Sequence, residues 1–166
     1  MVFDPFFQQL YDTPVATAIR EGSVLFPWIE SVHVLSIVTV VGAMVVIDLR
    51  LLGLAWTKRP ISKLTHEVLP LTWLAFVLAA ITGLLLFSSN AVKYTHNIFF
   101  LSKMCLLVIA FVNMVVFHFI TGRDIHLWDE APRAPAKVRV AGGISLAVWI
   151  AVVVCARWIG FTIGAF

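Results

Sequence analysis

Charged side chains are scarce in this chain of 166 residues. Asp, Glu, Lys and Arg make up 13% of it, while 61% of the residues are hydrophobic. A typical soluble domain is about a quarter charged and about half apolar. The chain therefore has too few polar side chains to cover a globule in water, which excludes a soluble enzyme and a disordered chain. The formal charge of +3 does not indicate nucleic-acid binding, because most basic residues lie in two short loops.

Cysteine is also scarce. Cys105 and Cys155 both lie within apolar runs, so we expect two small buried residues and no disulfide framework. Nucleophile constellations, glycine-rich phosphate loops and HExxH-type zinc motifs are absent from the sequence, which gives no support to a hydrolase or a kinase. Residues 1–23 lack a basic segment and a small-residue cleavage pattern, so we expect no cleavable signal peptide there.

Long apolar runs are abundant instead. Four stretches reach the roughly 20 apolar residues that a membrane-spanning helix needs, at about 28–56, 68–87, 98–120 and 140–163. No internal repeat or low-complexity linker divides them. The sequence therefore predicts an all-α fold, a single transmembrane domain over residues 1–166 built as an integral membrane bundle of four helices.

The lysines and arginines predict the orientation of this bundle. Loop 50–66 and loop 121–139 each hold four of the 12 basic residues, and the remaining four are spread over the rest of the chain. Basic loops are retained on the cytoplasmic side of a membrane. Both termini are therefore predicted to lie outside, in the periplasm, with the protein in the bacterial inner membrane.

The N-terminal segment 1–23 carries one apolar helical face. Its aromatic and aliphatic residues recur at helical spacing. We expect this segment to lie flat in the outer headgroup layer; covering the mouth of the bundle or docking a partner subunit are the alternatives. The face comprises Phe3, Phe6, Phe7, Leu10 and Tyr11.

Histidines at membrane depth are the first candidates for function, because buried ionisable groups are costly and normally face a partner. Four of them sort by depth into an outer pair, His33 and His96, and an inner pair, His66 and His118. Imidazoles from two helices of a bundle can hold b-type haem as axial ligands. A histidine that only hydrogen-bonds within the core is the simpler alternative for each. His126 is interpreted as an ordinary solvated residue.

Two cations and two glycines fit the same hypothesis. Lys103 and Arg157 lie roughly one to two turns below the outer surface, where they would neutralise haem propionates. Snorkelling to the headgroups is the alternative for both. Gly42 and Gly83, in mid-span, either let a flat cofactor approach or allow close helix packing, and packing is favoured.

Asp48 and Arg50 are two further ionisable residues, near the inner end of the first stretch. Glu30, His33 and Asp48 share one helical face within about 60°, whereas Arg50 points elsewhere. Asp48 and Arg50 can be interpreted as anchors at the membrane interface, and this interpretation is favoured for Arg50.

Copper is the alternative to haem. His33, Met104, Cys105 and Cys155 all lie in the outer half of the bundle, and imidazole, thioether and thiolate groups select Cu(I). Their spacing matches no recognised metal signature. A cofactor-free structural subunit of a larger membrane complex is the third hypothesis, suggested by the small size and short loops.

A set of short motifs extends over nearly the whole chain: residues 27–35 (PWIESVHVL), Gly42, 48–54 (DLRLLGL), 82–87 (TGLLLF), 92–94 (VKY), Asn97, Phe100, Lys103 and 113–118 (NMVVFH). On these motifs the chain resembles an uncharacterised family of small four-helix bacterial inner-membrane proteins. More remotely, it is similar to the membrane domains of copper-resistance protein D and of small b-type cytochromes. The family implies a fold and a location but no activity. His33 and His118 match its pattern better than His66 and His96 do.

The sequence thus predicts a membrane-embedded haem b protein. It would pass electrons between the quinone pool or a partner and an acceptor outside, as a non-catalytic cytochrome. Its expected partners are the lipid bilayer, a quinone, and a partner subunit or periplasmic redox protein; no nucleic acid is expected. The candidate ligands and propionate partners are His33, His66, His96, His118, Lys103 and Arg157.

Overall fold

The computed structural model describes residues 4–121, 125–131 and 133–163. These residues form helices and no strand, which confirms the all-α prediction. In chain order the elements are α1 (Asp4–Tyr11), α2 (Pro14–Glu21), α3 (Leu25–Leu52), α4 (Ile61–Ser89), α5 (Ala91–Thr95), α6 (Ile98–Val116), the π-helical turn η1 (Phe117–Thr121), the 3-10 turn η2 (Ile125–Leu127) and α7 (Ala136–Ile163).

Four of these helices are long and apolar enough to cross a membrane, at Leu25–Leu52, Ile61–Ser89, Ile98–Phe119 and Ala136–Thr162. They coincide with the four predicted stretches and indicate a membrane protein. The second and fourth helices begin earlier than predicted, because hydropathy marks only the apolar part of a helix whose first turns are polar.

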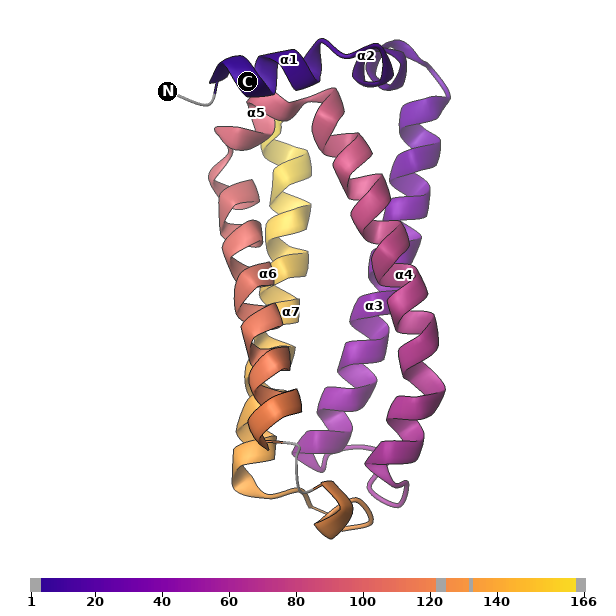
Figure 1. Cartoon of the computed structure of the whole chain (residues 1–166), viewed down its shortest axis with the longest axis vertical. Coiled ribbons are helices and arrows are strands. Elements are labelled where there is room, and N and C mark those ends of the chain that lie inside the picture. The colour runs from indigo at the N-terminus through magenta and orange to yellow at the C-terminus, as the bar shows by residue number, and fades with distance from the viewer. Residues whose placement is uncertain (1–3, 122–124, 132, 164–166) are drawn as a thin grey trace.

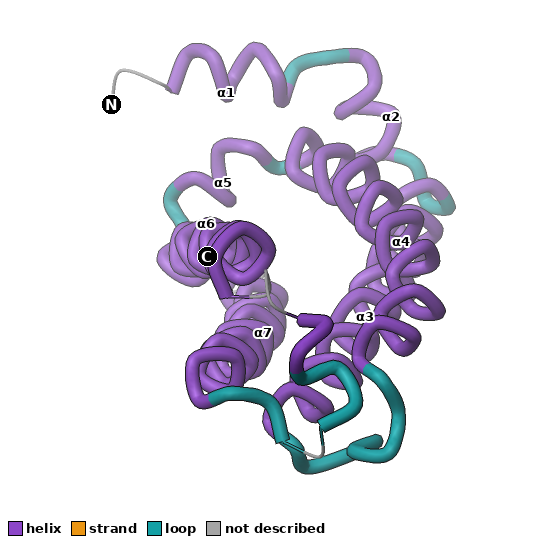
Figure 2. The backbone as a smooth tube through the Cα atoms, turned by 60° about the horizontal axis from the view of Figure 1, so that its bottom comes forward, coloured by secondary structure: helices purple, strands orange, loops and turns teal. Residues whose placement is uncertain are grey.

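The four long helices form two pairs. α3 packs along α4, α6 packs along α7, and the pairs meet where α3 contacts α7 (Figures 1 and 2). The short helices α1, α2 and α5 lie at the same end as the end of α7, which we name the terminal end (Figure 1). The α3–α4 connection and η2 lie at the opposite end, which we name the basic-loop end. The start and the end of the described chain therefore share one end of the molecule, because four long helices run along its length (Figure 1).

The helix α3 ends at Leu52, so the predicted boundary at Trp56 is wrong. Gly53 adopts the left-handed conformation with φ of 75°, which glycine reaches without steric cost. The Leu54 N–H then donates to the Leu49 carbonyl at 3.0 Å, which satisfies a carbonyl that the helix end leaves open. Glycine chemistry therefore ends the helix before the apolar run ends.

Arg50 is a buried structural centre, and its interpretation as an interface anchor is wrong. Its side chain is only 1% exposed. Nε donates to the Arg59 carbonyl at 2.8 Å, and Nη2 donates to the carbonyls of Asp129 and Ala131, each at 3.1 Å. One guanidinium thus joins the segment after α3 to the segment before α7.

A cluster of buried hydrophobic residues in the described chain lies at the basic-loop end, beginning with Leu51, the residue after this arginine. Residues of α3, α4, α7 and the segment between η2 and α7 contribute to it, so it joins the two helix pairs. Its burial is the main apolar stabilisation at this end of the bundle. The cluster comprises Leu51, Ile61, Leu64, Trp128, Ala134 and Val138.

The Asp129 carboxylate caps the N-terminus of α4. It accepts hydrogen bonds from the Ser62 N–H at 2.8 Å and from the Ser62 hydroxyl. Partial burial pushes the pKa of the Asp129 carboxyl up. The hydrogen bonds from Ser62 and Ile61, together with the Arg50 charge, outweigh burial and hold that pKa below its usual value. The capped state is therefore the ionised one.

Asp129→Ala is expected to lower the free energy of unfolding by about 1 kcal/mol at neutral pH, because α4 loses its cap. The pKa is lower in the folded state, so this stabilisation is complete above the ordinary carboxyl pKa of about 4. It is lost as the pH falls through the folded-state value. Unfolding of both proteins in detergent over a pH series measures the difference.

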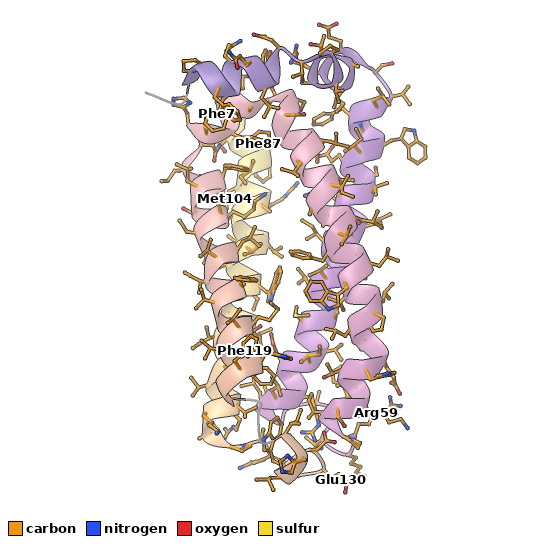
Figure 3. The ribbon with its side chains drawn as sticks, in the orientation of Figure 1. Phe7, Arg59, Phe87, Met104, Phe119 and Glu130 are labelled. Atoms are coloured by element: carbon orange, nitrogen blue, oxygen red, sulfur yellow. The ribbon has the colours of Figure 1, made fainter. Side chains whose placement is uncertain are left out.

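Glu130→Ala is the matched control, because Glu130 is exposed and adjacent to Asp129 (Figure 3). It should stay within about 0.5 kcal/mol of the wild type. A cost of Asp129→Ala that is equal at neutral and at strongly acidic pH would show that the charged cap contributes nothing.

Candidate functional site

Aromatic rings close the terminal end of the bundle. Phe7 of α1 lies 5.9 Å from Phe87 of α4, and Phe87 stacks on Phe100 of α6 at 5.4 Å between ring centroids (Figure 3). Tyr94 of α5 lies 5.2 Å from Phe100. We name these four residues the aromatic lid. Such ring contacts add about 0.5–1.5 kcal/mol each beyond area burial.

The N-terminal helix covers the bundle through this lid. Phe7 turns inward, as expected if the segment covers the mouth of the bundle, which was the less favoured alternative. Phe6, in contrast, is 62% exposed. Phe3 lies outside the described residues. The Arg20 guanidinium secures the neighbouring helix α2, since Nη1 donates to the carbonyls of Tyr11 at 3.1 Å and Ser89 at 3.4 Å.

His33 of α3 lies against the backbone of α4 below the lid. The ring is half-buried, and its Nδ1 lies 2.9 Å from the Thr82 hydroxyl. A Cβ atom added at Gly83 would lie only 2.9 Å from the His33 Cε1 atom. Gly83 therefore allows the His33 ring to approach the α4 backbone closely.

The Thr82 hydroxyl determines the tautomer of a neutral His33 ring. That hydroxyl lies 2.6 Å from the Leu78 carbonyl, which can only accept, so its single proton is directed there. It must then accept a hydrogen bond from Nδ1–H of His33. With the proton on Nδ1, Nε2 would keep its lone pair and would be the ring atom able to bind a metal.

Lys103 of α6 brings a positive charge to the same region. Its side chain is half-buried, and Nζ lies 5.3 Å from the centroid of the Phe100 ring. The ammonium acts electrostatically on His33 of α3 and on Cys155 of α7. In the described part of the chain no carboxylate forms an ion pair with it. We name His33, Thr82, Gly83, Lys103 and Cys155 the His33 cluster.

The other predicted histidines lie on the surface. His66 is exposed near the start of α4, and His118 is exposed in η1 with its ring against Phe119. His96 is exposed, with Nδ1 2.9 Å from the Val92 carbonyl. Of the five histidines, all of which are described, only His33 is half-buried. The geometry therefore singles out one histidine, where depth alone suggested two pairs.

The remaining candidate ligands also lie outside the cluster. Arg157 is exposed and lies over the Phe161 ring at 4.5 Å, one turn along α7. Met104 and Cys105 are exposed on α6, although Cys105 was expected to be buried, and Cys155 is only partly buried on α7. Within the described ranges, no group of three or more His, Cys, Asp or Glu residues is placed to hold a metal ion.

Sequence reasoning missed the residues that position the site. Thr82 was not singled out, although a threonine beside a glycine in an apolar helix was an available signal. The Tyr94 phenol was also missed as a site residue. Burial, and then the negative charge of Glu30, raise the pKa of Tyr94, so its phenol stays protonated.

Gly83→Ala is expected to displace the His33 ring, because the new Cβ overlaps it. Gly42→Ala is the matched control, since a Cβ there meets nothing within 4 Å. Both variants gain up to about 1 kcal/mol of helix propensity, but only Gly83→Ala adds an overlap cost of about 1–3 kcal/mol. Unfolding free energies and the His33 Cε1–H NMR signal measure this. An unmoved signal in Gly83→Ala would contradict the contact.

Comparison with known proteins gives a family and no activity. The model of a family described as of unknown function, DUF6644, matches residues 16–162. No curated protein and no solved structure matches the chain. The expected similarity to copper-resistance protein D and to small b-type cytochromes therefore gains no support from these comparisons.

Proposed function

We propose that this chain, which belongs to the DUF6644 family of unknown function, is a four-span protein of the bacterial inner membrane and binds haem b. It would pass electrons between the quinone pool or a partner and an acceptor outside. The observation that carries the proposal is the His33 cluster: a half-buried imidazole whose Nδ1 lies 2.9 Å from the Thr82 hydroxyl, together with the half-buried Lys103 ammonium, both inside candidate membrane spans.

The residues of the cluster fit the chemical demands of haem b. A haem needs an axial nitrogen ligand, apolar surroundings and cations for its propionates. The Nε2 atom of His33 would meet the first demand by ligating the haem iron. Lys103 would meet the last, because its half-buried ammonium has no carboxylate partner among the described residues and could pair with a propionate. When bound, haem would supply one-electron chemistry.

The surrounding residues orient and protect the site. Thr82 holds the His33 ring through Nδ1, as a hydrogen-bond partner on the far nitrogen does for a metal-binding histidine. Gly83 leaves space for that ring. The aromatic lid would limit the access of water from the terminal end, which would strengthen the interaction between Lys103 and an anionic group.

The charge distribution supports the proposed orientation. Lys58, Arg59, Lys63, Lys137 and Arg139 are exposed at the basic-loop end, away from the His33 cluster. Basic loops on the cytoplasmic side would place the cluster in the outer half of the membrane. Electrons would then leave toward an acceptor on the periplasmic face.

An absorption spectrum tests the proposal. The protein is purified from cells supplied with haem, and spectra are recorded oxidised and after reduction with dithionite. The expected result is a Soret band that shifts on reduction, at about one haem for each chain if His33 provides the single site. A colourless protein would overturn the proposal. Stoichiometric copper in a haem-free sample would instead favour the copper hypothesis.

A further inference from the structure

Asp48 is a buried carboxylic acid that the proposed haem site does not use. It lies on α3 toward the basic-loop end, one turn before Leu51 of the buried core, and its side chain is 3% exposed. Its Oδ2 atom has no hydrogen-bond partner among the described residues. Ser145 of α7 is the polar side chain that interacts with the carboxyl group.

The bundle closes over this carboxyl group on the α7 side. A Cβ atom added at Gly142 would lie 3.0 Å from the Leu51 Cβ and 3.5 Å from the Asp48 carbonyl oxygen. The small residue thus lets the α7 backbone approach α3 one turn before Ser145. Asp48 consequently faces the protein interior and not lipid.

No described cation compensates Asp48. The neighbouring Arg50 guanidinium donates to main-chain carbonyls of the two loop segments, and the charge it faces is that of Asp129. From α7, the group that faces Asp48 is the neutral Ser145 hydroxyl. An ionised carboxylate with a bare oxygen in such a place costs several kcal/mol, and a bound proton removes most of that cost.

We propose that Asp48 is a reversible proton-binding site inside the membrane. The carboxylate takes a proton from hydronium at the basic-loop end and releases water, and the reverse step returns the proton. This site is separate from the His33 cluster, since the two residues are 15 positions and about 22 Å apart along α3. The proton-binding proposal is therefore tested independently of whether the protein binds haem.

Dicyclohexylcarbodiimide labelling of the full-length protein in lipid nanodiscs tests the proposal. This apolar reagent adds the O–H of a protonated carboxyl group across a C=N bond, and the adduct rearranges to a stable acylurea without losing atoms. We expect Asp48 to be labelled at neutral pH, with a rate that falls roughly tenfold per pH unit once the carboxyl group ionises. Peptide mass spectrometry locates the label.

Labelling of two variants, and labelling of the wild type in the presence of sodium ions, complete the experiment. Asp48→Asn should abolish the label, whereas Glu30→Gln, which changes an exposed carboxylate on the same helix, should leave it unchanged. Sodium ions should not slow the reaction. An unlabelled Asp48, a rate independent of pH, or protection by sodium would each overturn the proposal, the last in favour of a sodium site.

Infrared spectroscopy of the wild type keeps the proposal testable if Asp48→Asn does not fold. A protonated buried carboxyl group gives a C=O stretching band distinct from that of carboxylates. The band should be present at neutral pH and should disappear on alkaline titration. Its absence at neutral pH would overturn the proposal without any variant.

Discussion

His33→Ala is expected to abolish haem binding, because it removes the ring whose Nε2 is free to ligate. Loss of a residue that only hydrogen-bonds to a metal ligand weakens a metal site by about 10–100-fold. Loss of the ligand itself should therefore weaken haem binding by more than about 100-fold. Titration of the haem-free protein with haem, followed at the Soret band, measures the affinity.

His96→Ala is the matched control for this variant. It removes a histidine that depth alone placed beside His33 but that the structure leaves exposed at the end of α5. Haem affinity should stay within a few-fold of the wild type. Equal losses in both variants would restore the outer pair as ligands, and unchanged affinity in His33→Ala would remove His33 from the site.

Arg50→Met is expected to lower the free energy of unfolding by about 3–5 kcal/mol, the largest stability effect in the molecule. The variant keeps the apolar stem but leaves the carbonyls of Arg59, Asp129 and Ala131 without their buried donor. Because those carbonyls belong to two separate segments, the variant also uncouples the α3–α4 pair from α7. Denaturant unfolding in mixed micelles measures the loss.

Arg59→Gln is the control for Arg50→Met. The Arg59 side chain pairs with Glu67 at 3.5 Å, but both are exposed, at 61% and 48%. Surface ion pairs of this kind contribute about 0–1 kcal/mol. If Arg50→Met were as mild as Arg59→Gln, the buried guanidinium would not be what joins the two loop segments.

The positions of the four long helices follow from the sequence, because hydropathy sums over some twenty residues and tolerates local exceptions. Helix ends do not follow so directly. The end of α3 depends on one glycine, Gly53, adopting a left-handed conformation. The start of α4 depends on a cap from Asp129, which is distant in sequence. Tertiary contacts of this kind leave no local pattern.

The candidate site was predicted in part. Placing histidines by depth found His33 and Lys103, but depth does not show which way a side chain faces around its helix. His66, His96 and His118 share suitable depths and are nevertheless exposed. Whether a ring enters the bundle depends on what the neighbouring helix offers, here the Thr82 hydroxyl and the missing Cβ of Gly83.

Buried polar residues were the hardest to interpret from sequence. Arg50 and Asp48 lie near the end of an apolar run, where most charged residues reach the headgroups. The structure instead buries both, with exposed fractions of 1% and 3%. Arg50 is satisfied by carbonyls of two separate segments, and Asp48 by Ser145 on one side only. The partners of Arg50 and Asp48 are distant in sequence, so they can be recognised only once α3 is packed on α7.

The protonation of the His33 ring tests the account most directly. Nitrogen-15 NMR of the haem-free protein labelled at histidine distinguishes the two ring nitrogens, and Thr82→Val assigns the signal that depends on the hydroxyl. We expect a proton on Nδ1 and none on Nε2. A proton on Nε2, with none on Nδ1, would contradict this, because the ring would then have no free nitrogen with which to bind a metal in the interior of the bundle.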